Sequence, residues 1–134
     1  MVKSPVMIKV RLVCGMNEQI NMKWQELKSE HQVHRILEES KSTPVLIFKH
    51  SNRCSTSRLV LDRLTRKWKE DEMGHLRPYF LDLISFRDTS NFIAREFDVP
   101  HESPQVLIIE NGRSIYDCSH FDIDYDQILK VSKN

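Results

Sequence analysis

The sequence predicts an α/β protein in which helices cover both faces of a central mixed β-sheet. Short apolar segments rich in β-branched residues alternate with segments whose apolar residues recur at helical spacing. This alternation is typical of parallel strands joined by helices. One Asn-Gly pair between two strand-like segments then predicts an antiparallel hairpin. The predicted order of elements is therefore β-α-β-α-β-α-β-β-α.

The first part of the chain supplies two strands and a helix. The alternation over residues 20–24 predicts a short strand, and Ser29 with Gln32 has the spacing of a capping box at a helix start. That helix should end before Pro44, because the residue preceding a proline disfavours helical backbone. The run "PVLIF" at residues 44–48 is continuously apolar, as expected of a strand buried on both faces.

The middle of the chain predicts two further helices around a strand. Apolar residues at helical spacing predict a helix from Ser55 to Glu70, and Gly74 follows as a break. The run "YFLDLI" at residues 79–84 predicts a strand. Asp88 is then expected to cap a helix whose inner face carries Phe92, Ile93 and Phe97.

The last part of the chain predicts the hairpin and a closing helix. "QVLII" at residues 105–109 predicts a third buried strand, and "SIYD" at residues 114–117 its partner. The pair Asn111-Gly112 between them is the hairpin signal. A final helix is expected over roughly residues 122–131. Strands joined by helices should run parallel through right-handed crossovers, so the hairpin forms the antiparallel edge.

Composition excludes several classes of function. The 134 residues suffice for one domain with its own core, and 40% apolar with 29% charged residues of both signs is typical of a globular protein. A formal net charge of +1 gives no bulk attraction to nucleic acid or to an anionic membrane. No run of about 18 apolar residues predicts a membrane-spanning helix. Three widely spaced cysteines argue against a secreted disulfide framework, so the cytoplasm is the expected compartment.

The N-terminal segment has two interpretations. Residues 1–15 contain apolar positions that alternate with Lys9 and Arg11, which is typical of an extra strand and not of a signal peptide. Alternatively, Met16 is the natural start and residues 1–15 form a disordered tail. In both cases we expect a single domain over residues 16–134.

Cys54 is the candidate nucleophile. In open α/β sheets, reactive groups lie outside the carboxyl ends of the strands, and Cys54 follows "PVLIF" at the expected start of a helix. Backbone N–H groups and the positive end of the helix dipole favour an anion there, so we expect the thiolate of Cys54 to be stabilised. Arg53 and Arg58 would add positive potential, and His50 could contribute as well.

The alternative is that Cys54 is a buried structural residue, as free cysteines often are. Its neighbours from Ser51 to Thr56 are polar, which indicates an exposed loop and helix start. Cys14 and Cys118 have no such setting, and we expect both to be structural. Strand alternation places Cys118 on the same face as Tyr116, packed in the interior, although a resolving role for Cys118 stays open.

Ser57 stands where a C-x-x-C pair would have its second sulfur. A dithiol pair releases a mixed-disulfide partner by intramolecular attack, and serine cannot do this. The Ser57 hydroxyl can still hydrogen-bond to the thiolate. A site with one thiol must pass its adduct to an external thiol, which suits the transfer of a small thiol from a protein.

A C-x-x-S segment at a helix start, in this order of elements, resembles the thioredoxin superfamily. "ESPQVLII" is similar to the segment in which thioredoxin-like folds carry a cis proline before the strand that leads into the last hairpin. The resemblance implies that Pro104 is cis and faces Cys54. It also implies that the Ser103 backbone can pair with a substrate like an added strand. The alternative is a trans proline that begins a strand.

A narrower resemblance covers nearly everything from about Ile20 onward. "PVLIFKHSNRCSTS" and "SPQVLIIENGRSIYDCSHFDI" are similar to the YtxJ family of thioredoxin-like proteins, from bacteria that use bacillithiol. That family is regarded as monothiol bacilliredoxins, which remove bacillithiol from protein mixed disulfides. Some members have Cys-Pro-Ile-Ser, whereas Ser55 replaces the proline here, so the reactivity of Cys54 can differ in degree.

The resemblance implies a role for each matching residue. Cys54 is the nucleophile, and Ser57 occupies the resolving position. Pro104 and Ser103 dock the substrate, while Ser119 and His120, at a turn that approaches the active-site loop, contact the small thiol together with Arg53. His120 as a plain surface residue is the alternative. Bacillithiol would be a co-substrate, with no bound cofactor or metal. The partners would be bacillithiolated proteins and a low-molecular-weight thiol, and the protein itself would be a monomer or a weak dimer.

Three other functions remain open from the sequence. A monothiol glutaredoxin-like protein using glutathione or an iron–sulfur cluster usually has Cys-Gly-Phe-Ser, which "CSTS" does not match. A zinc site could use His50, Cys54, Cys118 and His120, but their spacing fits no common zinc motif. A thioredoxin-fold interaction module without turnover would make Cys54 incidental.

Overall fold

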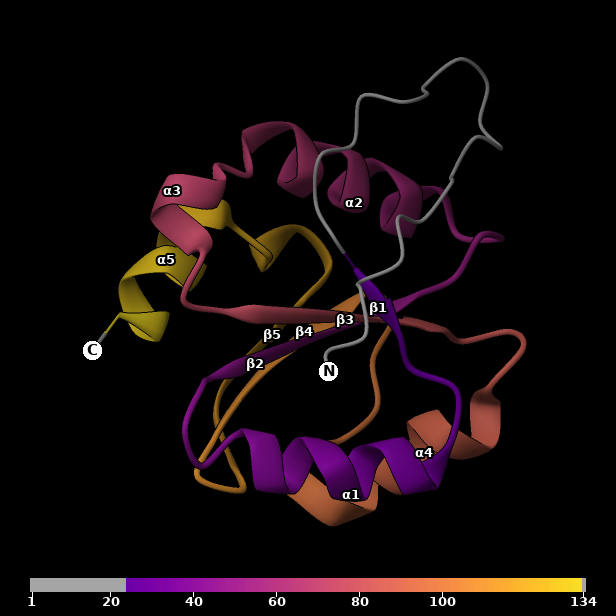
Figure 1. Ribbon diagram of the computed structural model, residues 1–134. Helices are drawn as coiled ribbons and strands as arrows, with labels where there is room; N and C mark the ends of the chain where they lie inside the picture. Colours follow the sequence, from indigo (N-terminus) through magenta and orange to yellow (C-terminus); the bar gives the residue numbers. More distant parts are fainter. Residues whose placement is uncertain (1–23, 134) are drawn as a thin grey trace.

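The computed structural model describes residues 24–133, which form one mixed five-stranded sheet between two layers of helices (Figure 1). The strands are β1 (Gln25–Glu26), β2 (Val45–His50), β3 (Arg77–Asp82), β4 (Gln105–Glu110) and β5 (Arg113–Ser119). The helices are α1 (Glu30–Glu39), α2 (Ser55–Lys67), α3 (Glu70–Met73), α4 (Arg87–Phe97) and α5 (Tyr125–Ser132), with a 3-10 turn η2 (His120–Asp122). The predicted α/β class is confirmed.

The sheet has the order β1-β3-β2-β4-β5. β2 and β3 are parallel, as are β1 and β3, whereas β4 is antiparallel to both β2 and β5. The prediction of parallel strands is confirmed for β1, β2 and β3, and the predicted hairpin forms the antiparallel edge. It is wrong for β4, which α4 joins to β3, because β4 runs antiparallel to β2 and therefore to β3 as well. Of the strand predicted over residues 20–24, residues 20–23 lie outside the described part of the chain, and so does the 1–15 segment.

Two apolar layers hold the helices against the sheet. Figure 1 shows α1 and α4 below the sheet and α2, α3 and α5 above it. Leu46 and Phe48 of β2 face the upper cluster, while Val45 and Ile47 face the lower one. All six residues of β2 are buried, so the prediction of a strand buried on both faces is confirmed.

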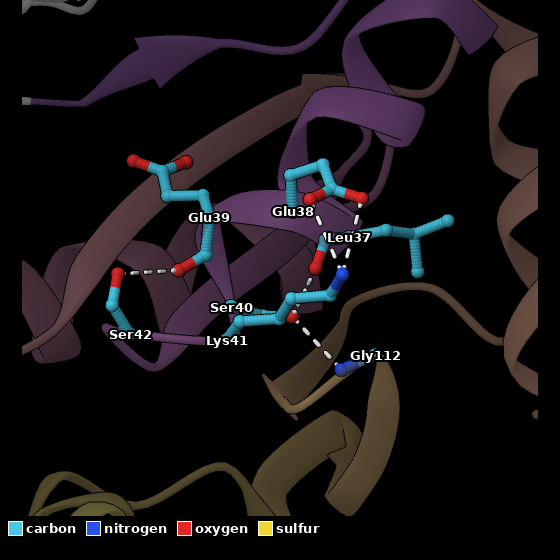
Figure 2. A network of polar contacts seen from close by, with 7 residues as sticks. All are labelled: Leu37, Glu38, Glu39, Ser40, Lys41, Ser42 and Gly112. Carbon is cyan, nitrogen blue, oxygen red and sulfur yellow. Dashed lines mark hydrogen bonds and ion pairs between the residues drawn. The ribbon is translucent and has the colours of Figure 1, made fainter.

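The hairpin turn between β4 and β5 is fixed by backbone conformation and by contacts to α1. Asn111 and Gly112 both have positive φ, 52° and 75°, which is the combination that a tight hairpin turn requires. The N–H of Asn111 donates to the Ser40 carbonyl oxygen at 2.8 Å, and the N–H of Gly112 donates to Ser40 Oγ at 2.9 Å. Ser40 Oγ in turn donates to the Leu37 carbonyl oxygen at 2.9 Å (Figure 2). The turn is therefore attached to the end of α1.

The start of α4 differs from the prediction. Phe86, and not Asp88, is its N-cap residue, and Asp88 lies in the first turn. The reason is Asp82, the last residue of β3, whose carboxylate accepts hydrogen bonds from the N–H of Ile84 and from Ser85. This side-chain turn ends the strand two residues early and starts the helix before Asp88.

The start of α1 agrees with the prediction, whereas the end of α2 does not. Ser29 is the N-cap of α1 and accepts from the N–H of Gln32, as predicted. The helix predicted to run from Ser55 to Glu70 ends at Lys67, because Trp68 has extended backbone, and the chain then forms the short α3. Within residues 24–133, no helix combines the length and apolarity that crossing a membrane needs.

Candidate functional site

Cys54 lies where β2 is connected to α2, at the carboxyl end of the strand. It is the N-cap residue of α2, with extended backbone (φ −106°, ψ 117°), and its side chain is partly exposed. Its N–H donates to the Ser51 carbonyl oxygen at 3.1 Å, and its own carbonyl accepts from the N–H of Arg58 at 3.1 Å. The predicted location at a helix start is confirmed.

The Cys54 side chain accepts no capping hydrogen bond. The N-terminus of α2 therefore acts on the Cys54 sulfur through its electric field and not through a hydrogen bond from a particular backbone N–H. The sulfur is in no disulfide, and both Cys54 and Cys118 are free thiols. Cys14 lies outside the described residues.

Two arginines border the loop that precedes α2. Arg58 Nη1 donates to the Asn52 carbonyl oxygen at 2.7 Å, so its guanidinium braces the loop from the first turns of α2. Arg53 is exposed, and its N–H donates to Ser51 Oγ at 3.3 Å. Arg58 thus places its positive charge on the loop that carries Cys54, whereas for Arg53 only the backbone contact and the exposure are established, so its contribution stays a prediction.

Ser57 does not face the solvent beside the thiol but is completely buried under the loop. Its Oγ lies 2.7 Å from His50 Nδ1 and accepts a hydrogen bond from the N–H of Ser51 at 3.1 Å. His50 Nε2 lies 2.9 Å from Asn52 Oδ1. The predicted hydrogen bond from Ser57 to the Cys54 sulfur is absent from these contacts.

The sequence named His50 only as a possible source of positive charge, and it did not identify its contacts with Ser57 and Asn52. It is 4% exposed, and burial lowers its pKa below the ordinary value for histidine, so the imidazole is neutral near pH 7. Its ring also lies 5.3 Å from the ring of Phe80 and 6.2 Å from that of Phe48. Strand alternation could have indicated it, because His50 and Phe48 share the face of β2 that α2 covers.

The segment around Pro104 lies at the same end of the sheet as Cys54. β2 and β4 are antiparallel with Lys49 opposite Gln105, so the residues that follow β2 and those that precede β4 lie at the same end of the sheet. The Ser103-Pro104 peptide bond is cis, the isomer that the resemblance implied. Ser103 Oγ is buried without a hydrogen-bond partner.

The turn after β5 contacts this segment through its backbone. The N–H of His120 donates to the Pro104 carbonyl oxygen at 3.0 Å, and Ser119 is the last residue of β5. The imidazole Nε2 of His120 lies 3.5 Å from Glu102 Oε1, and both side chains are about half exposed. The turn therefore contacts the Pro104 segment, with the His120 ring beside Glu102, while its predicted approach to the Cys54 loop stays a prediction.

Cys118 has a different environment from Cys54. It is half-buried and packs with Tyr116 against the apolar cluster under α2, on the face that strand alternation predicted. Burial raises the pKa of the Cys118 thiol to about 11. A thiol with that pKa is a poor nucleophile at neutral pH.

No three side chains of the metal-binding types His, Cys, Asp and Glu gather anywhere in residues 24–133. In particular, His50 uses its two ring nitrogens for Ser57 and Asn52, which leaves neither for a metal ion. The site thus offers one partly exposed sulfur at a helix terminus and, three residues later, a buried hydroxyl in place of a second sulfur. Such an arrangement can carry out thiol–disulfide exchange by one sulfur.

Known proteins resemble this chain in both family and fold. The family model described as "Monothiol bacilliredoxin BrxC" matches residues 25–128. A solved protein with a thioredoxin fold is 28% identical, with a TM-score of 0.69 over 81% of this chain and 92% of that one. Thioredoxin from Malassezia sympodialis is 14% identical, with a TM-score of 0.64 over 90% of this chain and 96% of that one.

Thioredoxin from Fasciola hepatica shows the same fold at 12% identity, with a TM-score of 0.61 over 81% of this chain and 95% of that one. The two thioredoxins establish the fold alone, and the family model, which is described as monothiol, establishes the family. That match spans β1 to α5 and includes the loop, Cys54, Ser57 and Pro104. The chain has a thioredoxin fold and belongs to the monothiol bacilliredoxin BrxC family.

Proposed function

We propose that this protein is a thiol–disulfide oxidoreductase that removes bacillithiol from protein mixed disulfides through Cys54. The observation that carries the proposal is one partly exposed sulfur at the start of α2, with the buried hydroxyl of Ser57 at the resolving position. A site with one sulfur accepts a small thiol and needs another molecule of thiol to release it. The family match supports the same chemistry.

The reaction proceeds in two exchanges. In the first, the Cys54 thiolate attacks the bacillithiol sulfur of the mixed disulfide. A new disulfide forms between Cys54 and bacillithiol, the original disulfide breaks, and the target protein leaves as a thiolate that takes up a proton. In the second, the thiolate of another bacillithiol attacks the bacillithiol sulfur on Cys54. Oxidised bacillithiol leaves and Cys54 is regenerated as a thiolate.

The residues around Cys54 have separate tasks in this proposal. The positive end of α2 and the guanidinium groups of Arg53 and Arg58 stabilise the thiolate, both as the nucleophile and as the leaving group of the second exchange. The Ser103–Pro104 backbone and the Ser119–His120 turn, which meet through the bond from His120 N–H, form the docking surface for the mixed disulfide. Bacillithiol is a co-substrate and not a bound cofactor.

The test is release of bacillithiol from a purified, bacillithiolated target protein, followed by mass spectrometry. The wild-type protein should remove the adduct and transiently carry it on the peptide that contains Cys54. Cys54→Ser should be inactive, while Cys118→Ser, the matched control, should retain activity. Activity that survives Cys54→Ser would refute the assignment of the nucleophile.

The same assay identifies the thiol. Target proteins carrying bacillithiol, glutathione or cysteine are compared at equal concentrations with the wild-type protein. We expect the bacillithiol adduct to be removed fastest. Preference for the glutathione adduct would instead support the glutaredoxin-like alternative, and no turnover of any adduct would support an interaction module.

A further inference from the structure

The chain of contacts beneath Cys54 fixes the hydrogen position on each nitrogen of His50. The Asn52 Oδ1 atom, 2.9 Å from Nε2, can only accept, so Nε2 carries a hydrogen. Because buried His50 is neutral, Nδ1 then has no hydrogen and must accept. The group 2.7 Å from Nδ1 is the Ser57 hydroxyl, which therefore donates to His50.

The Ser57 hydroxyl has only one hydrogen to donate. Its oxygen also accepts from the N–H of Ser51 at 3.1 Å, so one donor and one acceptor function are both in use. Cys54 is the N-cap residue of α2, and Ser57 is the third residue of the helix, at the position toward which an N-cap side chain is directed. If the hydrogen were not committed to His50, the Cys54 thiolate would be an anionic acceptor nearby.

We propose that His50 is a positioning residue that keeps the Ser57 hydroxyl hydrogen-bonded to the imidazole and away from the Cys54 sulfur. The proposal rests on Cys54 being the nucleophile of the proposed function, and it explains why a hydroxyl at the resolving position leaves the sulfur reactive. A direct hydrogen bond from a hydroxyl stabilises a thiolate and lowers its nucleophilicity. With His50 in place, the thiolate is stabilised by the helix terminus and the arginines, which leave its lone pairs free.

The same contacts also hold the loop that carries Cys54. His50 Nε2 binds Asn52 Oδ1, and Asn52 O accepts from Arg58 Nη1 at 2.7 Å. The imidazole therefore connects β2, the loop and α2 at one buried point. Loss of His50 would both loosen the loop and release the Ser57 hydrogen, so the experiment must separate these two effects.

A double-mutant cycle makes that separation. The variants are His50→Phe, Ser57→Ala and the two together, and His31→Phe, at an exposed position of α1, is the control. Phenylalanine keeps the ring packing against Phe80 and removes both ring nitrogens. The measured quantity is the rate constant for alkylation of Cys54 by iodoacetamide, at a pH where the rate has reached its plateau, read by mass spectrometry of the Cys54 peptide.

We expect His50→Phe to lower the plateau rate constant about tenfold, the effect of one hydrogen bond to an anion. Ser57→Ala and the control should stay within about twofold of the wild type. The double variant should return close to the wild-type value, because no hydroxyl remains to bind the sulfur. A double variant as slow as His50→Phe, or a single His50→Phe variant with unchanged rate, would overturn the proposal.

A second measurement needs no variant and no folding control. Long-range ¹H–¹⁵N spectra of the wild-type protein at pH 7 report which nitrogen of each histidine carries the hydrogen. We expect His50 to have its hydrogen on Nε2, and a hydrogen on Nδ1 would refute the direction of the Ser57 bond. Neither measurement involves bacillithiol, so a failed transfer assay and a failed positioning role give different results.

Discussion

Lys49 provides the sharpest test of the energetics of this fold. It is 0% exposed, although it carries an amine, and its Nζ makes one hydrogen bond, to the Ser90 carbonyl oxygen at 3.3 Å. Burial, followed by the positive charge of Arg87, lowers its pKa from 10.5 to about 8. The perturbation that isolates this effect is Lys49→Met, which keeps a long, flexible side chain without the amine.

The size and sign of the effect follow from the pKa difference. A shift from 10.5 to about 8 corresponds to roughly 3 kcal/mol by which the buried charge weakens the folded state at pH 7. Removing the bond to Ser90 costs about 1 kcal/mol in return. Lys49→Met should therefore raise the free energy of unfolding at pH 7 by about 2 kcal/mol.

The difference between the two proteins should change with pH. Between pH 8 and pH 10.5 the unfolded wild type binds more protons than the folded one, so wild-type stability gains up to about 3 kcal/mol from Lys49 as the pH rises. The variant has no such gain. Its advantage should shrink above pH 8 and become a deficit of about 1 kcal/mol at pH 10.5.

Urea unfolding at pH 7, 8, 9 and 10 measures this difference through the fluorescence of the buried Trp24 and Trp68. Burial also raises the pKa of Tyr125 to about 12, which makes both proteins lose stability at the alkaline end. That loss is common to both, so it cancels in the comparison. A variant that is less stable at pH 7, or a difference that does not vary with pH, would refute the reasoning.

Three further outcomes are expected. Alkylation of Cys118 at pH 8 should be slow, because with a pKa of about 11 only about one thiol in a thousand is ionised. The alkylation rate should rise tenfold per pH unit up to pH 11, and fast labelling at pH 8 would contradict the burial of this thiol. Gly112→Ala should lower the free energy of unfolding, measured with urea, by about 1 kcal/mol, because a residue with a side chain is strained at a φ of 75°. The nearest atom to the new Cβ, Leu37 Cδ2, is 3.9 Å away, so no steric clash adds to this strain. An unchanged free energy of unfolding would exclude a turn with positive φ at this position. Ser29→Ala should cost about 1 kcal/mol by removing the acceptor for the Gln32 N–H, and unchanged stability would show that this cap contributes nothing.

The sequence predicted the fold wherever one local signal determines an element. β2 was predicted from a continuous apolar run, α1 from the cap at Ser29, and the hairpin from Asn111-Gly112. The errors concern boundaries that a distant or unexpected side chain decides. Asp82 binds the backbone of the following loop and moves the start of α4, a competition that apolar periodicity does not register.

The candidate site was predicted in its location and only partly in its contacts. Cys54 could be placed because a strand, a polar loop and a helix start follow one another in the sequence. The partner of the Ser57 hydroxyl could not, because it depends on which faces of β2 and α2 meet. The approach of the Ser119–His120 turn to the active-site loop was implied by resemblance and not by spacing. The contact of this turn with Pro104 could not be predicted, since only the tertiary fold brings the two segments together.

The buried polar residues at the end of β2 lower the stability of the fold near the site. Residues 45–48 of this strand are buried and apolar, whereas Lys49 and His50, the two residues nearest the Cys54 loop, are buried and polar on opposite faces. Burying polar groups costs free energy, and apolar residues of similar size would hold the sheet at least as well. Stability alone therefore does not account for this change within one strand. His50 has a use at the site, since it binds both the loop and α2, whereas Lys49 binds Ser90 of α4 on the opposite face. A Lys49→Met variant that is more stable and a His50→Phe variant that alters Cys54 would together show that the polar end of β2 lowers stability and that His50 serves the site.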